Sequence, residues 1–149
     1  DKESFEEVKP YFNEMGSVIE YMGECGQGQH TKLANQIGIA GTIIGTCESL
    51  LYAAKVGISL EQFIETIKTG SAGSWQLTNM GPRIIQEDFN PGFYIKHFIK
   101  DLKLAIDECE KMNLKLRGLE LVHSIYNEVK NTENENLGIQ GLYKILKEI

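Results

Sequence analysis

The sequence lacks the patterns that mark several large classes of protein. Its 149 residues include 15 lysines and arginines against 21 aspartates and glutamates, and the lysines are mixed with glutamates along the chain. Because binding to a nucleic-acid backbone needs a clustered basic surface, we expect no nucleic-acid partner. No run of 18 apolar residues and no signal-peptide pattern occurs. The sequence therefore predicts no membrane partner and a cytoplasmic location.

Cysteine and histidine are scarce and scattered. The three cysteines, Cys25, Cys47 and Cys109, match no zinc or CxxC spacing, and the three histidines form no HxxxH or HExxH pair. We therefore expect no metal site. Cys47 and Cys109 fall on apolar helical stripes, which favours small buried side chains in a reducing compartment.

What the sequence does contain is helical periodicity. The dominant pattern runs from about residue 29 to residue 56, with apolar residues four and three apart: Leu33, Ile37, Ala40, Ile44, Cys47, Leu51 and Ala54. Apolar residues on a second flank predict that this helix is buried on most sides. Gly38, Gly41 and Gly45 inside it predict that another helix packs close by, and Gly57 predicts its end.

The rest of the chain predicts shorter helices around the long one. A capping box at Ser59 to Gln62 opens one that is closed by Gly70, and others are predicted over residues 95–112, 118–129 and 138–149. Residues 71–94 are rich in Gly, Ser, Asn and Pro and predict a long ordered loop that carries Trp75. The fold class is therefore mainly α, a multi-helical domain around one long central helix.

The first 22 residues differ from the rest. Ser4 and Glu7 form a capping-box pattern that predicts a helix ending by Gly16, and SVIEYMG (17–23) predicts a short strand. A lone strand is not stable by itself, so either its partner lies outside this chain or the strand is absent. The sequence also begins without a methionine, which suggests a piece of a longer protein.

The stretch GQGQHTKLANQ (26–36) leaves three interpretations open. As a dinucleotide motif it is weak, because Thr31 replaces the third glycine of GxGxxG and no second strand follows. Its backbone amides could still bind a phosphate at the helix start. Lys32, Asn35 and Gln36 share one helix face and could bind a carboxylate or a carbonyl. The commoner alternative is a solvated surface lysine with polar neighbours.

Three separated segments resemble one family. GECGQGQHTKLANQ resembles the GxxGxGxxxK segment that opens the C-terminal domain of the β-hydroxyacid dehydrogenases, which include 3-hydroxyisobutyrate dehydrogenase and tartronate semialdehyde reductase. GSAGSW and NPGFYIKHFIKDLKLA resemble the substrate loop and the KDL segment of that family, in the same order. The likeness covers essentially the whole chain, and three motifs in order are more specific than any one of them.

The resemblance implies a role for each matching residue. Lys32 would be the catalytic acid/base, which protonates the carbonyl oxygen as hydride arrives or takes the hydroxyl proton in reverse. Asn35 would contact the substrate, although related enzymes place an asparagine at the next position, where this chain has Gln36, so either amide could be the main contact. The resemblance also implies substrate contacts by Gly28, Ser74, Trp75 and Phe93, and cofactor contacts by Phe93, Lys100 and Asp101.

The resemblance further implies an enzyme that uses NAD or NADP to interconvert a small β-hydroxy acid and its semialdehyde or keto acid. Residues 1–22 would be the tail end of a missing N-terminal Rossmann domain, and residues 23–149 an all-helical C-terminal domain for substrate binding and dimerisation. The expected partners are a small hydroxy acid and a second copy of the chain, and the piece alone would be inactive. From the residues alone, a helical dimerisation or binding module without chemistry of its own stays possible.

Overall fold

The computed structural model describes residues 1–147 and holds α-helices and two short 3-10 helices, with no β-strand in that range. The elements are α1 (Lys2–Asn13), α2 (Gln27–Lys55), α3 (Leu60–Ile67), α4 (Trp75–Ile85), α5 (Ile95–Lys111), α6 (Arg117–Asn127), η1 (Glu133–Asn136), η2 (Ile139–Gly141) and α7 (Leu142–Lys147). The predicted mainly-α class is confirmed. The last two residues of the helix predicted over 138–149 lie outside the described residues.

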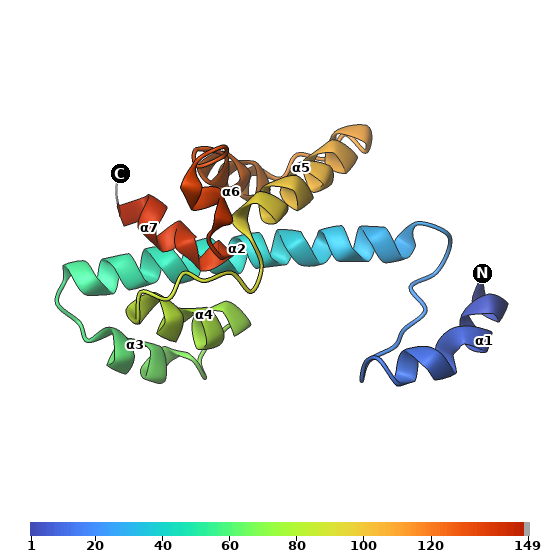
Figure 1. Ribbon diagram of the computed structural model, residues 1–149, viewed down its shortest axis with the longest axis horizontal. Helices are drawn as coiled ribbons and strands as arrows, with labels where there is room; N and C mark the ends of the chain where they lie inside the picture. Colours follow the sequence, from blue (N-terminus) through green and yellow to red (C-terminus); the bar gives the residue numbers. More distant parts are fainter. Residues whose placement is uncertain (148–149) are drawn as a thin grey trace.

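The long helix α2 is the axis of the molecule. Helices α5, α6 and α7 lie along one side of it, and α3 and α4 lie along the other (Figure 1). The buried core combines α2 with the helices that follow it, and its largest members include Ile43, Leu50, Phe98, Leu102 and Tyr126. The predicted central helix is therefore confirmed.

The buried face of α2 is not the predicted stripe. Its buried residues are Gln36, Ala40, Ile43, Thr46, Cys47, Leu50 and Ala53, so only Ala40 and Cys47 of the predicted set are buried. Leu33, Ile37 and Ile44 of the stripe are partly buried against the core, and helices pack on α2 from both sides, in line with the second apolar flank. The stripe did not include Gln36 and Thr46, because these two buried residues are polar. Cys47 and Cys109 are buried as expected, and burial raises the pKa of the Cys47 thiol to about 12.

The ends of two helices follow the sequence rules. Gly57 adopts a left-handed conformation with φ of +78° directly after the last residues of α2, a conformation that glycine adopts without steric cost. The Ser59 side chain accepts a hydrogen bond from the Gln62 backbone N–H at the start of α3. By contrast, apart from the adjacent residues and the backbone of α2 itself, no described atom lies within 4 Å of a Cβ placed at Gly38, Gly41 or Gly45. The expected helix contact at these glycines is therefore absent between described residues.

Residues 75–85 form a helix rather than part of a loop. Ser74 caps it, because its side chain accepts a hydrogen bond of 3.0 Å from the Leu77 N–H. Gly81 lets α3 approach closely, since a Cβ there would lie 2.8 Å from the Ile64 side chain. The loop prediction was wrong because it relied on the Gly, Ser, Asn and Pro content of the segment. Leu77 and Ile84 nevertheless pack in the core, which favours a helix there. Pro82 lies within the last turn of this helix.

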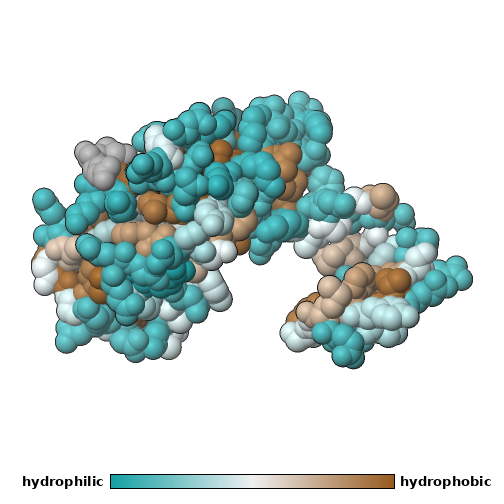
Figure 2. Space-filling model, viewed as in Figure 1, coloured by the Kyte–Doolittle hydropathy of each residue, from teal (hydrophilic) through white to brown (hydrophobic). Residues whose placement is uncertain are grey.

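The N-terminal residues form an arm that stands apart from the helical body (Figure 1). Helix α1 starts earlier than predicted, because the Asp1 carboxylate accepts from the Ser4 N–H at 2.9 Å and thereby takes the capping role expected of Ser4. Residues 17–23 form no strand, since they pair with no other segment in residues 1–147. Apolar and aromatic side chains on the arm are exposed, including Val8, Tyr11, Phe12, Met15, Val18 and Met22. Figure 2 shows brown and tan atoms on the surface of the arm, among white and teal ones.

Helix α2 also meets, by length and composition alone, the requirements for a helix that crosses a membrane. Core helices of soluble proteins meet the same requirements. Seven side chains of α2 are buried against the other helices of this domain.

Candidate active site

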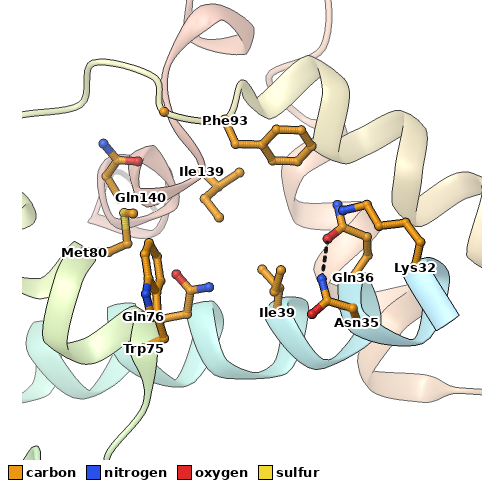
Figure 3. A pocket seen from close by; sticks show the side chains of 11 residues that line it. Lys32, Asn35, Gln36, Ile39, Trp75, Gln76, Met80, Phe93, Ile139 and Gln140 are labelled. Atoms are coloured by element: carbon orange, nitrogen blue, oxygen red, sulfur yellow. Dashed lines mark hydrogen bonds between the residues drawn. The ribbon is translucent and has the colours of Figure 1, made fainter. Parts of the chain in front are cut away.

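A cavity of about 540 Å³ opens between α2, α4, the segment before α5, and η2 (Figure 3). Helix α2 contributes Lys32, Asn35, Gln36 and Ile39 to its wall, all from two adjoining turns. Because residues three and four apart share a helix face, this clustering follows directly from their spacing. The predicted polar triplet therefore lines a cavity, with Gln36 buried and with Lys32 and Asn35 exposed at its opening.

A chain of hydrogen bonds orders the α2 end of the cavity. The Asn35 Nδ2 donates to the Gln36 Oε1 at 3.2 Å, and the Gln36 Nε2 donates to the Asp101 Oδ2 at 2.8 Å. The Lys100 Nζ lies 2.7 Å from the Asp101 Oδ1. Gln36 is only 1% exposed, so both ends of its amide are engaged inside the protein. The chain fixes how Asn35 is presented to the cavity.

The charge of Asp101 is stabilised within this network. Partial burial raises the pKa of its carboxyl group, but the hydrogen bonds from Lys100 and Gln36 and the charges of Lys100 and Lys32 outweigh burial. The net result is a pKa below the ordinary value. Asp101 is thus held as a carboxylate between two lysines.

Lys32 points along the same end of the cavity, beside an aromatic ring. Its Nζ lies 5.9 Å from the centroid of the Phe93 ring, which is within the range of a cation–π contact. The segment that carries Phe93 is tied down on both sides. Gly138 donates its N–H to the Phe89 carbonyl and Ile139 donates to the Phe93 carbonyl, at 2.9 and 3.1 Å.

A second set of contacts holds the turn that precedes Phe93. The Arg83 Nε donates to the Asp88 Oδ2 at 2.8 Å, and an Arg83 terminal nitrogen donates to the Asn90 carbonyl at 2.6 Å. The hydrogen bonds from Arg83 and Asn90 lower the pKa of the Asp88 carboxyl group to about 2. The ring beside Lys32 is therefore positioned by bonded backbone rather than by a free loop.

The α4 end of the cavity has a different character. Trp75, Gln76 and Met80 form its wall, with Ile139 and Gln140 of η2 above them (Figure 3). Trp75 is 62% exposed, so it is not part of the buried core of this domain. Gln76 is 5% exposed, and its Oε1 has no hydrogen-bond partner among the described residues.

Four of the predicted residues do not line this cavity. Gly28 lies one turn before Lys32 on α2 and is exposed. Ser74 uses its hydroxyl to cap α4 and borders a neighbouring groove with Gly41 and Gly45. Asp101 contacts the cavity through Gln36, and Lys100 borders a groove between α5 and α6. The functional roles given to these residues stay predictions.

Sequence reasoning missed several wall residues. Ile39 follows Gln36 by three residues, so helical spacing alone could have included it. Gln76 and Met80 were hidden because their segment was interpreted as a loop. Ile139 and Gln140 are distant in sequence, and no motif marks them.

Comparisons with known proteins place the chain in a family. Residues 26–146 match the protein family described as the NAD-binding domain of NADP-dependent 3-hydroxyisobutyrate dehydrogenase. The chain is 47% identical over 145 residues to an uncharacterized oxidoreductase, YkwC, of Bacillus subtilis, across 97% of this chain and 50% of that protein. It is 43% identical, across its full length and 44% of the relative, to a probable mitochondrial 3-hydroxyisobutyrate dehydrogenase-like protein of Arabidopsis thaliana.

Two further relatives extend the comparison. The 2-hydroxy-3-oxopropionate reductase of Escherichia coli is 34% identical over 147 residues, across 99% of this chain and 50% of that enzyme. The solved structure of Mycobacterium tuberculosis 3-hydroxyisobutyrate dehydrogenase with L-serine has the same fold, with a TM-score of 0.90 at 23% identity over 99% of this chain and 53% of that one. The chain spans about half the length of the curated relatives it matches. It belongs to the family of 3-hydroxyisobutyrate dehydrogenase-like proteins, whose cofactor is NAD or NADP.

Proposed function

We propose that this chain is the helical, lysine-bearing part of an NAD(P)-dependent dehydrogenase of small β-hydroxy acids. The observation that carries the proposal is the placement of Lys32, Asn35 and Phe93 on one end of a single cavity. These residues come from two of the three sequence segments that resemble the family. The membership of the family supports the same chemistry.

Lys32 would move the proton. In the reducing direction its ammonium group donates a proton to the carbonyl oxygen of the substrate, and in the oxidising direction the neutral amine accepts the hydroxyl proton. The nicotinamide, when bound, supplies the hydride donor or acceptor. Asp101 and the Phe93 ring keep the surroundings of Lys32 favourable to a cation.

Asn35 is the better candidate for the amide that contacts substrate. Gln36 donates to Asp101 and accepts from Asn35, so both ends of its amide are used. Asn35 uses one N–H in this network, and its other N–H and its oxygen have no hydrogen bond to any described residue. Gln36 therefore acts as a positioning residue, and Asn35 as the group that holds the carbonyl or the carboxylate.

The residues of the chain fit only one part of a dinucleotide. Phe93 offers a flat ring and Lys100 offers an ammonium group, 65% exposed, for a ribose or a phosphate. No strand precedes Gly26 and Gly28 in the described range, so the usual cradle for the pyrophosphate is not formed there. We infer that an upstream Rossmann domain completes the site.

The N-terminal arm supports this two-domain arrangement. Its apolar side chains are left exposed by residues 1–147, and a soluble protein rarely leaves such a patch uncovered. We therefore propose that residues 1–22 are the tail end of the nucleotide-binding domain and that residues 23–149 form the C-terminal domain. The half-length coverage of the relatives agrees with this division. A homodimer and a cytoplasmic location stay predictions.

The substrate class follows from the relatives and from the cavity. The relatives are named for 3-hydroxyisobutyrate and 2-hydroxy-3-oxopropionate, both small acids. Lys32 and Asn35 offer a donor and an amide for an oxygen-rich ligand of that class. The competing function is a helical dimerisation or binding module. The uncovered glycines of α2, Gly38, Gly41 and Gly45, leave space for a helix of a partner to pack closely.

The test compares two lysines of the same helix. Full-length protein with its upstream domain is assayed for NAD+- and NADP+-dependent oxidation of a panel of β-hydroxy acids. Lys32→Ala should lower kcat by about 10²- to 10⁴-fold, while Lys55→Ala, an exposed lysine at the far end of α2, should leave it unchanged. No turnover of any acid, or equal effects of the two variants, would favour the binding module.

A further inference from the structure

Three buried glutamines surround the cavity, and they differ in how their amides are bonded. Gln36, Gln76 and Gln140 are 1%, 5% and 1% exposed. Gln36 bonds to Asn35 and Asp101. Gln140 donates from its Nε2 to the carbonyls of Asp88 and Asn90, at 3.1 Å each. Gln76 forms no hydrogen bond with any described side chain or backbone group, and its Oε1 is fully buried.

An unpaired buried amide oxygen is costly, and native proteins rarely keep one without a reason. The surroundings of Gln76 make the cost larger, because Trp75, Met80, Ile39 and Ile139 are mostly apolar walls. Figure 3 shows the Gln76 amide turned into the cavity from the first turn of α4. The Ser74 cap fixes that turn. An aliphatic side chain would fill the same place without an unpaired oxygen.

We propose that Gln76 binds a second hydroxyl group of the substrate and selects hydroxylated acids over their alkyl counterparts. This inference rests on the proposed dehydrogenase function and deepens it. A hydroxyl both donates and accepts, so it pairs with whichever end of the Gln76 amide faces the cavity. It accepts from the nitrogen, and after a half-turn of the amide it donates to the oxygen, which is buried in the structure. A methyl group at the same place leaves that end of the amide without a partner.

The dimensions of the cavity agree with one ligand that reaches both ends. Lys32 and Gln76 line the same cavity of about 540 Å³, and Gln76 lies beside Ile39 (Figure 3). A cavity of this volume is large enough for a small acid that contacts both side chains. Such an acid can therefore touch Lys32 with its reacting oxygen and Gln76 with another.

The experiment uses pairs of acids that differ only by a hydroxyl in place of a methyl group. Glycerate and 3-hydroxyisobutyrate form such a pair at the carbon next to the carboxylate. The acids 3,4-dihydroxybutanoate and 3-hydroxypentanoate form another pair at the far end of the chain. For full-length enzyme, the ratio of kcat/KM for the hydroxylated acid to that for its methyl counterpart should exceed one in at least one pair. The pair that responds places the second hydroxyl.

Gln76→Met, which keeps the length of the side chain and removes its hydrogen bonds, should lower this ratio by roughly 10- to 100-fold. Gln86→Met makes the same replacement at an exposed position at the end of α4 and should leave the ratio unchanged. If Gln76→Met fails to fold, Gln76→Leu takes its place. A glutamine with only a structural role would lower turnover of both members of a pair alike, and the ratio would stay constant.

The possible outcomes distinguish the proposed role of Gln76 from the proposed dehydrogenase activity. An enzyme that turns over the acids but prefers the methyl member in both pairs overturns the role of Gln76 and leaves the dehydrogenase standing. The role of Gln76 is also overturned if Gln76→Met leaves the ratio of the two kcat/KM values unchanged. Wild-type protein that turns over none of the four acids with either cofactor overturns both.

Discussion

The two ends of the cavity differ in how their polar side chains are hydrogen-bonded. At the α2 end, Asn35, Gln36, Asp101 and Lys100 form one continuous set of polar contacts. At the α4 end, Gln76 stands among apolar walls with its oxygen unpaired. A bonded network fixes groups before the substrate arrives, which a proton transfer needs. An unpaired group keeps its bonding capacity for the ligand. Under the proposed function, the α2 end carries the proton transfer and the α4 end selects the substrate.

The largest effect is expected from a change that keeps charge and removes acid/base chemistry. Lys32→Arg preserves a cation beside the Phe93 ring, but a guanidinium does not give up its proton near neutral pH. We expect kcat to fall by about 10²-fold or more while KM changes little. Steady-state kinetics of the full-length enzyme measure both. A variant that retains most of its kcat would assign Lys32 to binding alone.

A smaller effect is expected from breaking the network at its centre. Gln36→Leu leaves Asp101 and Asn35 without their buried partner, so kcat should fall by roughly 10-fold and the free energy of unfolding by about 1–3 kcal/mol. Urea unfolding and steady-state kinetics give the two values. The matched change at the other end, Gln140→Leu, should lower stability while sparing the proton-transfer step. Equal losses of kcat in the two variants would contradict the division of the cavity into two ends.

The sequence predicted the α2 end of the cavity better than the α4 end, for a physical reason. Lys32, Asn35 and Gln36 lie within two turns of one helix, so their shared face follows from spacing alone. Gln76 faces the cavity only because α4 forms, and the glycine and proline in its segment concealed that helix. Its neighbour Gln140 comes from a segment more than 60 residues away. Contacts of that kind depend on how helices pack, which periodicity does not record.

The same reasoning explains why the predicted stripe of α2 was incomplete. Counting apolar residues assigns burial by residue type, whereas packing from both sides buried Gln36 and Thr46 and left Ala54 exposed. The central position and the end of the helix were nevertheless predicted, because a long apolar pattern and a left-handed glycine are local signals.

A modest effect on stability is expected at the start of η2, where the Gly138 backbone lies close to the Gln140 side chain. A Cβ at Gly138 would lie 2.3 Å from the Gln140 Oε1, so Gly138→Ala must displace that side chain from the carbonyls of Asp88 and Asn90. We expect a loss of about 1 kcal/mol in the free energy of unfolding, measured by thermal denaturation. Gly118→Ala is the control, since nothing lies near its Cβ position. Equal stability of the two variants would show that Gln140 moves at no cost.

The smallest effect concerns the dependence of stability on pH. The pKa of Asp101 is lowered in the folded protein, so its carboxylate contributes stability at pH values above its unfolded pKa, about 3.9. That contribution is lost as the pH falls through the unfolded value toward the folded one. Asp101→Asn should therefore lose less stability than wild type between pH 7 and pH 3 in urea unfolding. If the free energy of unfolding changed with pH in the same way in both proteins, the Asp101 carboxylate would make no net contribution to stability through its hydrogen bonds.

The position of Lys32 on α2 has a consequence for motion. The first fully buried side chain of the helix is Gln36, and the residues from Gln27 to Lys32 are exposed. Helix ends with few buried contacts open more readily than the core that follows them. The amide protons of the first turns of α2 should accordingly exchange with solvent faster than those near Ile43 and Leu50. If Lys32 acts as proposed, ligand binding should slow exchange in these turns, so that the lysine becomes rigid when a ligand is present.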